Sequence, residues 1–174
     1  MTELYRGKFL GLYQTGTWEY CTRVNSRAVV VVAAMTQQQE VLLVEQFRPP
    51  VAGRVMEFPA GLVGDLPGAE NEALTVAAQR ELEEETGYTA GSLEPLMKGP
   101  VSAGLTSEQI HFFLGRELTK TGAGGGVSTE DITVHTIKWG RCHDWLAERQ
   151  AQGILVDPKV YGGLYFLGRN LALD

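Results

Sequence analysis

The distribution of hydrophobic positions predicts several buried strands. Two runs rich in β-branched residues, at 27–34 and 40–44, are separated by the polar residues 36–39. Continuous apolar runs of this length are typical of strands that are buried on both faces, and the short polar break between them predicts a hairpin. Shorter patterns of the same kind predict further strands at 55–58, 109–114 and 131–139.

Helical signals occur at three places. The first predicted helix runs from about residue 71 to 86 and stops at Gly87, and the second runs from about 141 to 152 and stops at Gly153. A third, short helix is expected after Asp157, which can cap the helix before Pro158 opens its first turn. Strand and helix signals do not alternate regularly, which favours an α+β fold with a mixed β-sheet and a few helices over a doubly wound sheet.

Composition and charge narrow the class of protein. The 174 residues are 44% hydrophobic and 21% charged, which predicts one compact domain over residues 1–174. The net charge of −6 argues against a nucleic acid polymer as partner. The longest apolar run, 28–35, is too short to cross a membrane, and two cysteines are too few for a disulfide framework. We therefore expect a cytoplasmic protein with no membrane partner.

The acidic residues of the first helix are unevenly placed. Its apolar residues share one face, and they are Leu74, Ala77, Ala78 and Leu82. Glu81 and Glu85 fall within about 20° of the centre of that face, whereas Glu83 projects to the opposite side. Carboxylates at core positions are costly unless a cation neutralises them, so this pattern predicts a site for a hard divalent ion such as Mg²⁺. The alternative is that the acidic run is a solvated helix face.

The same helix carries a motif. Residues 80–88 read RELEEETGY and follow Glu72 after seven intervening residues, a pattern that resembles the signature of the Nudix hydrolases. The stretches EQFRPP at 45–50, EFPAGL at 57–62 and VDPKVY at 156–161 extend the similarity over most of the chain and resemble the ADP-ribose or ADP-sugar pyrophosphatase branch. This resemblance implies a Nudix-like α/β/α sandwich with a mixed β-sheet and an N-terminal arm or small sheet. It also implies a homodimer in which residues 1–26 contribute to dimerisation and substrate binding.

The resemblance assigns roles to residues of this chain. Mg²⁺, or alternatively Mn²⁺, would be held by Glu81, Glu85, Glu84 and the backbone carbonyl of Ala60. Arg80 would orient these carboxylates. The resemblance also implies that Arg80 and Glu84 are catalytic residues.

The sequence departs from the family pattern in two places. Leu66 stands where the signature has a glycine, and an insertion of five residues in the loop 64–71 accounts for the shift. Further along, Ala103 replaces a proline of the ADP-ribose branch, next to Gly104, which we expect to contact substrate.

A general base is expected after the glycine-rich residues 122–126, which predict a mobile loop. This stretch leads into Ser128, Thr129, Glu130 and Asp131, just before a predicted strand. A carboxylate on such a loop can reach the attacking water when substrate is bound, and we assign this role to Glu130, with Asp131 as the alternative. An ordinary solvated hairpin loop is the structural alternative.

Other residues are candidates for substrate binding. Arg48 and Arg54 flank a Pro-Pro turn and suit phosphate oxygens. Glu57 could bind ribose hydroxyls or pair with an arginine, and Trp18 could stack on adenine or pack in a core or dimer interface.

Together these features predict a Mg²⁺-dependent enzyme. It would hydrolyse the pyrophosphate bond of ADP-ribose or a related nucleoside diphosphate sugar to AMP, or another nucleoside monophosphate, and a sugar phosphate. One alternative is a Nudix hydrolase of another nucleotide, such as GDP-mannose or an oxidised triphosphate. Another is a non-catalytic sensor of a nucleotide sugar.

Overall fold

The computed structural model describes residues 1–127 and 130–171, so Ser128 and Thr129 of the predicted catalytic loop lie outside the described residues. The strands in chain order are β1 (Thr2–Arg6), β2 (Leu10–Thr15), β3 (Trp18–Arg23), β4 (Ala28–Ala34), β5 (Glu40–Arg48), β6 (Gly53–Glu57), β7 (Ala60–Val63), β8 (Tyr88–Thr89), β9 (Ser92–Pro100), β10 (Gln109–Arg116), β11 (Thr119–Lys120), β12 (Ile132–Lys138) and β13 (Leu155–Val156). The helices are α1 (Leu74–Thr86), α2 (Cys142–Ala151) and α3 (Pro158–Leu171), with short 3₁₀ turns at Pro49–Val51 and Trp139–Arg141.

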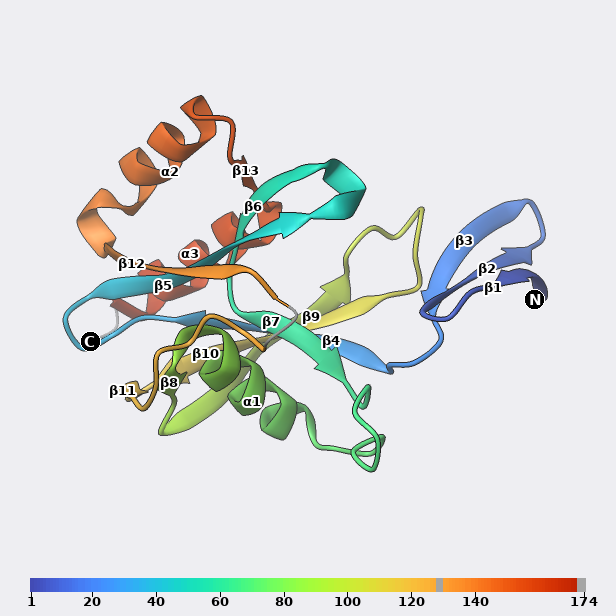
Figure 1. Cartoon of the computed structure of the whole chain (residues 1–174), viewed down its shortest axis with the longest axis horizontal. Coiled ribbons are helices and arrows are strands. Elements are labelled where there is room, and N and C mark those ends of the chain that lie inside the picture. The colour runs from blue at the N-terminus through green and yellow to red at the C-terminus, as the bar shows by residue number, and fades with distance from the viewer. Residues whose placement is uncertain (128–129, 172–174) are drawn as a thin grey trace.

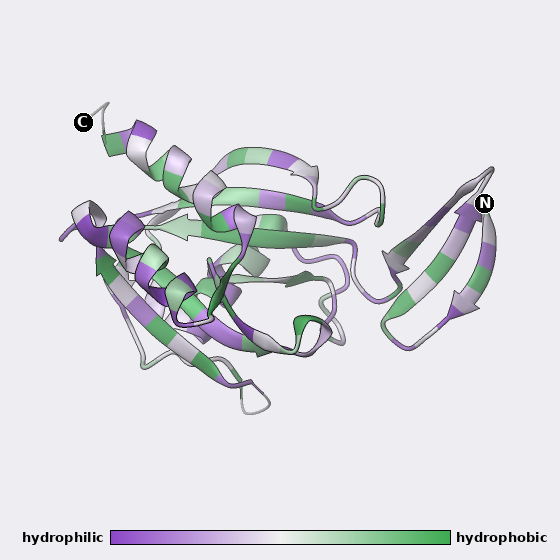
Figure 2. Cartoon of the chain, turned by 90° about the horizontal axis from the view of Figure 1, so that it is seen from above, coloured by the Kyte–Doolittle hydropathy of each residue, from purple (hydrophilic) through white to green (hydrophobic). Residues whose placement is uncertain are grey.

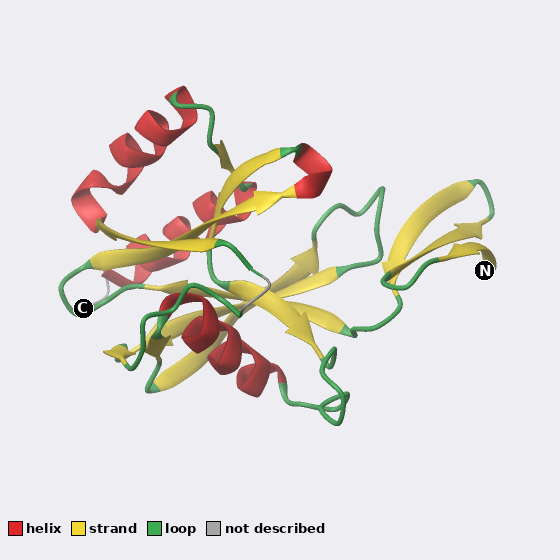
Figure 3. Cartoon of the chain, in the orientation of Figure 1, coloured by secondary structure: helices red, strands yellow, loops and turns green. Residues whose placement is uncertain are grey.

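The strands form two larger mixed sheets and two smaller ones. One larger sheet has the order β7-β4-β10-β9 and the other has the order β12-β5-β6-β13. Helix α1 packs on one side of β4 and β7, whereas α3 packs against β4, β6 and β10 from the other side (Figures 1 and 3). This layering confirms the predicted sandwich of helices around mixed β-structure.

Strand β4 lies at the centre of the core because both of its faces are apolar. Val31 and Ala33 pack in the cluster that contains Leu164 of α3, and Val30 and Val32 pack in the cluster around α1. All four of these β4 side chains are fully buried. Figure 2 shows that the central strands are hydrophobic, and the burial of both faces of β4 is what the apolar run in the sequence predicts.

The prediction that the two apolar runs form a hairpin is wrong. The turn after β4 does form, with the backbone amide of Thr36 donating to the carbonyl of Glu40 at 2.9 Å and one isolated bridge between Met35 and Val41. Beyond it the strands separate, because β4 pairs with β10 on one edge and β7 on the other. No edge of β4 remains for β5, which pairs instead with β6 and β12.

The helices lie where the sequence predicts them, with changed ends. Helix α1 begins at Leu74 rather than near residue 71, because the preceding residues form a turn in which the amide of Glu72 donates to Ala69. It ends as predicted at Gly87, which has φ 73°. Helix α3 spans 14 residues and is longer than predicted, and Asp157 caps it by accepting from the amide of Lys159 at 2.7 Å.

Several strands have no clear signal in the sequence. Strand β9 contains Pro95 and ends at Pro100, and it lies at the edge of its sheet, where prolines are tolerated. Strand β7 is only four residues long. Neither segment shows the alternation or the β-branched run by which a strand is predicted.

The N-terminal residues form an antiparallel sheet of β1, β2 and β3 that projects from one end of the molecule (Figure 1). The amide of Cys21 donates to the carbonyl of Leu105, and the amide of Ser107 donates back to Cys21. These bonds connect the sheet to the loop between β9 and β10. The expected N-terminal small sheet is therefore present.

Within residues 1–127 and 130–171, none of the helices has the length and apolar character needed to span a membrane.

Candidate active site

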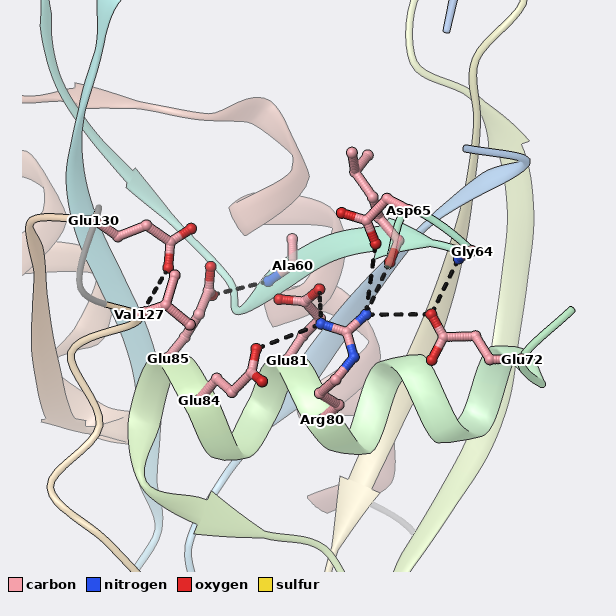
Figure 4. Close-up of polar contacts among 11 residues, drawn as sticks. Ala60, Gly64, Asp65, Glu72, Arg80, Glu81, Glu84, Glu85, Val127 and Glu130 are labelled. Carbon is pink, nitrogen blue, oxygen red and sulfur yellow. Dashed lines mark hydrogen bonds and ion pairs between the residues drawn. The ribbon is translucent and has the colours of Figure 1, made fainter. Parts of the chain in front are cut away.

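Helix α1 presents carboxylates to the sheet side as well as to solvent. Glu85 is only 3% exposed and accepts a hydrogen bond of 3.0 Å from the backbone amide of Ala60 (Figure 4). Glu81 lies against Gly61, where an added Cβ would approach the Glu81 carboxyl carbon to 1.9 Å. Gly61 thus leaves the space that the Glu81 carboxylate occupies. The placement predicted from the helical pattern is confirmed, and the solvated-face alternative does not hold for these two residues.

Arg80 connects the acidic residues of the site. Its guanidinium donates to Glu81 at 2.7 Å, to Glu84 at 3.4 Å and to the carbonyl of Leu62 at 3.1 Å (Figure 4). A planar guanidinium can hold several oxygen acceptors in fixed directions. The structure therefore brings Arg80, Glu81 and Glu84 together, as expected.

Glu72 joins the same network from the inserted loop. Its carboxylate accepts from Arg80 at 3.2 Å and from the backbone amide of Gly64 at 3.0 Å. Asp65, in the loop 64–71, lies 3.9 Å from Arg80 of α1. It is not among the residues predicted from the sequence. The insertion therefore leaves Glu72 beside Arg80, and the loop bends back to it. The signature spacing links Glu72 to the helix motif, but nothing in the sequence indicates that the loop closes through the Gly64 amide.

Burial changes the acid–base properties of the inward carboxylates. Burial raises the pKa of Glu81 to about 7, even though the adjacent Arg80 charge lowers it. Burial likewise raises the pKa of Glu85 well above its ordinary value, against the hydrogen bond from Ala60. The negative charges of Glu81, Glu130 and Glu57 add to the increase for Glu85. Such a group of buried acids needs protons or a cation to compensate its charge.

The donor set fits a hard divalent cation. Glu81, Glu84, Glu85 and the Ala60 carbonyl offer only oxygen ligands, which Mg²⁺ prefers. In the described part of the chain, no three His, Cys, Asp or Glu side chains converge as a ready metal-binding group. Instead, Glu81 and Glu84 turn to Arg80, and Glu85 turns to the amide of Ala60. Each of these donors contacts one oxygen of its carboxylate, and a cation would bind at the other.

The two candidate bases occupy different surroundings. The Glu130 carboxylate accepts from the amide of Val127 at 3.0 Å and lies against Gly126, which is bonded to the end of α1 (Figure 4). Its charge contributes to the raised pKa of Glu85. Asp131 is 84% exposed and pairs with Arg54 at 3.0 Å. The structure therefore places Glu130, and not Asp131, beside the acidic helix.

The glycine-rich segment 122–126 is a loop, as predicted, and it packs against the end of α1. The amides of Gly125 and Gly126 donate to the carbonyls of Glu85 and Glu84 at 2.8 and 2.9 Å. A Cβ on Gly124 would lie 2.3 Å from the backbone carbonyl carbon of Thr86. Glycine is therefore required for this close approach, and the segment satisfies carbonyls at the helix end that carries the acidic residues.

Arg48 and Glu57 meet beside this site. Arg48 donates to Glu57 at 2.7 Å, and Glu57 is only 7% exposed. Burial lowers the pKa of Arg48, but Glu57 and the charges of Glu85 and Asp157 outweigh it, so that the net pKa is raised. The structure confirms Glu57 as the partner of an arginine and places both residues near Glu85.

Arg54 and Trp18 lie in other parts of the molecule. The donors of Arg54 are directed to Glu45 and Asp131. Trp18 is 64% exposed and, with Gly104, lines a groove of about 400 Å³ between the N-terminal sheet and the β9–β10 loop. Two predicted substrate-binding residues therefore share a groove, at the end of the molecule away from α1 (Figure 1).

Comparison with known proteins identifies the family. A family model described as NUDIX domain matches residues 24–155. The chain belongs to the Nudix family. This finding confirms the resemblance based on the α1 motif, and the matched range contains α1, Glu57, Glu72 and Glu130.

Individual relatives are similar over part of their length. The chain is 33% identical to an ADP-ribose pyrophosphatase of Bacillus subtilis (strain 168) over 67% of this chain and 64% of that protein. It is 33% identical to a methanol dehydrogenase activator of Bacillus methanolicus over 63% and 56% of the two chains. It is 31% identical to a GDP-mannose pyrophosphatase of Enterobacter sp. (strain 638) over 67% and 62%. The matches thus span between about half and two thirds of these relatives.

A solved structure supports the fold. The crystal structure of an ADP compounds hydrolase aligns with a TM-score of 0.71 and 18% sequence identity, over 98% of this chain and 91% of that chain. The fold shared with that hydrolase therefore includes the N-terminal sheet and α3.

Proposed function

We propose that this Nudix protein hydrolyses the pyrophosphate bond of ADP-ribose or a related nucleoside diphosphate sugar. Water adds across one P–O–P bond and yields a nucleoside monophosphate and a sugar phosphate. The observation that carries the proposal is the inward face of α1, where the buried carboxylates of Glu81 and Glu85 are held by Arg80 and the Ala60 amide. The relatives named for ADP-ribose and GDP-mannose hydrolysis support this substrate class.

The acidic residues would hold the metal. Mg²⁺, with Mn²⁺ as a substitute, would be bound by Glu81, Glu84, Glu85 and the Ala60 carbonyl. When bound, the ion supplies charge neutralisation for the phosphate oxygens and lowers the pKa of water. Arg80 fixes the direction of the Glu81 and Glu84 carboxylates, and Glu72 holds Arg80 from its far side.

The protein groups around this helix would handle the water and the substrate. Glu130 would accept the proton of the attacking water, because its carboxylate is exposed and faces Glu85. Arg48 would contact phosphate oxygens while Glu57 fixes its orientation.

The direct test is product formation from a panel of substrates. The purified protein is incubated with ADP-ribose, ADP-glucose, GDP-mannose and an oxidised nucleoside triphosphate, with and without Mg²⁺. We expect AMP and ribose phosphate from ADP-ribose in the presence of Mg²⁺ only. Binding of ADP-ribose that is insensitive to chelator and releases no product would contradict hydrolysis and support the sensor alternative.

GDP-mannose is the second candidate substrate. It is favoured by the similarity to a GDP-mannose pyrophosphatase and by Ala103 in place of the proline of the ADP-ribose branch. A higher kcat/KM for GDP-mannose than for ADP-ribose in the same panel would establish this preference.

We also propose that the N-terminal sheet mediates a homodimer and contributes Trp18 to nucleobase binding. The sheet projects from the molecule and exposes the aromatic residues Tyr5, Phe9 and Trp18, which makes an apolar surface suited to a second copy of the chain.

Light scattering should give twice the mass of one chain. Tyr5→Asp should shift the protein toward the monomer, whereas Tyr165→Asp, at an equally exposed tyrosine of α3, should leave the mass unchanged.

A further inference from the structure

The carboxylate next to Glu130 is tied to a neighbouring strand. Asp131 lies directly before β12, and its carboxylate pairs with the Nη1 of Arg54 on β6 at 3.0 Å. In the sheet order β12-β5-β6-β13, β5 lies between these two strands. The ion pair therefore crosses over the central strand and ties the start of β12 to β6.

Arg54 is itself held from several directions. Its Nε donates to the carboxylate of Glu45, and its Nη2 donates to the Glu45 carbonyl at 3.2 Å and to the Thr133 hydroxyl at 3.4 Å. The other carboxylate oxygen of Glu45 bonds to His135 Nε2 at 3.0 Å. The His135 ring lies 5.0 Å from that of Trp145 in α2. Arg54 is thus a fixed anchor for Asp131, because three strands and a helix support it.

The side chains near the start of β12 point to two opposite sides of the sheet. Asp131, which directly precedes β12, and Thr133 within it both contact Arg54, so Ile132 between them points to the opposite side of the sheet. Ile132 and the Glu130 carboxylate both lie against Gly126, whose amide donates to the Glu84 carbonyl of α1. The ion pair of Asp131 with Arg54 therefore restrains the backbone next to Glu130.

We propose that Arg54 and Asp131 are positioning residues that hold Glu130 toward the α1 carboxylates. This inference rests on the proposed function of Glu130 as the base. Apart from the Val127 amide, no hydrogen-bond donor to Glu130 occurs among the described residues, so its position depends on its backbone. Holding a catalytic group in a reactive geometry contributes to turnover rather than to substrate binding.

The same geometry separates this role from direct phosphate contact. The Nε and both terminal nitrogens of Arg54 already donate to protein oxygens. A residue that contacts phosphate in the ground state raises KM when it is removed, whereas a positioning residue lowers kcat. The prediction that Arg54 binds phosphate therefore gives a different kinetic result from the role proposed here.

The test uses Asp131→Asn and Arg54→Gln in the full chain with ADP-ribose and Mg²⁺. We expect kcat to fall by about 10- to 100-fold in each variant, with KM changed less than about twofold. The matched control is Lys138→Gln, which removes the 2.9 Å ion pair between Lys138 and Glu40 at the other end of β12 and β5 and should leave kcat unchanged. Wild-type kcat in Asp131→Asn, or a rise in KM alone, would overturn the proposal.

A double-mutant cycle shows whether the pair acts through Glu130. In the Glu130→Gln background, Asp131→Asn should lower the remaining kcat no further, because the group it positions is absent. An equal loss in both backgrounds would overturn the inference and indicate a general structural effect. If Glu130→Gln alone keeps full turnover, the base assignment fails and the positioning role fails with it. If Glu130→Gln is impaired while Asp131→Asn and Arg54→Gln are fully active, only the positioning role fails.

Discussion

At the scale of single residues, the site depends on carboxylates that occupy core positions. Glu85 is buried and the Glu81 side chain is only 12% exposed, at positions where leucine or alanine would pack without electrostatic cost, whereas Glu83 on the outer face of α1 is exposed. Their position follows from the helical period alone. Their contacts do not, because Gly61, Ala60 and Leu62 come from a strand that precedes the helix by more than ten residues.

Replacing Glu85 tests this distinction directly. Glu85→Gln should lower kcat/KM by about a hundredfold or more, because it removes a charged oxygen from the proposed metal site while keeping the size of the side chain. Glu83→Gln, a matched change on the exposed face of the same helix, should change kcat/KM by less than about twofold. Steady-state kinetics and circular dichroism of both variants make the measurement, and full activity of a folded Glu85→Gln protein would contradict the assigned site.

At the scale of elements, α1 is held by the segments that precede and follow it. Before the helix, Glu72 binds Arg80 and the amide of Gly64, and at the end of the helix the glycine-rich segment binds the carbonyls of Glu84 and Glu85. The composition of 122–126 predicts a loop and nothing of its contacts. The requirement for glycine arises only from the backbone of α1 lying next to it.

The glycine segment gives a stability prediction. Gly124→Ala should lower the free energy of unfolding by about 2 to 4 kcal/mol, because φ is 72° and the new Cβ would overlap the Thr86 backbone. Gly68→Ala, at a φ of 84° with open space around the Cβ, carries the backbone cost alone and should lose only about 1 kcal/mol. Chemical denaturation measures both values. Equal losses in the two variants would show that the contact with α1 does not stabilise the fold.

At the scale of the whole molecule, the acidic site lowers the free energy of unfolding of the metal-free protein as the pH rises. The pKa of Glu81 is 4.5 in an unperturbed chain and about 7 in the fold. A carboxyl whose pKa is raised by folding contributes stability that is fully present below pH 4.5 and is lost as the pH rises through about 7. Above that pH the charge of Glu81 is offset only by Arg80 unless a cation binds.

The unfolding free energy of the metal-free protein should therefore fall from pH 5 to pH 8, with about 3 kcal/mol of the decrease coming from Glu81. Glu81→Gln removes this titration and serves as the reference, since the lowered pKa of His111 acts in the opposite direction in both proteins. Denaturation at each pH makes the comparison, and Mg²⁺ at pH 8 should restore stability to the wild type. Identical pH profiles for the two proteins would contradict the raised pKa of Glu81.

The sequence by itself determined the two-sided burial of β4, the inward face of α1 with Glu81 and Glu85, and the helix end at Gly87. Each of these depends on the period of a strand or helix, or on one residue's backbone freedom, so a short window of sequence contains the information. Tertiary structure decided that β4 and β5 lie in different sheets, that Glu72 reaches Arg80, and that Asp131 pairs with Arg54 while Glu130 faces α1. These features depend on which sheet edges and polar groups remain free after distant segments have packed, and no local pattern records that outcome.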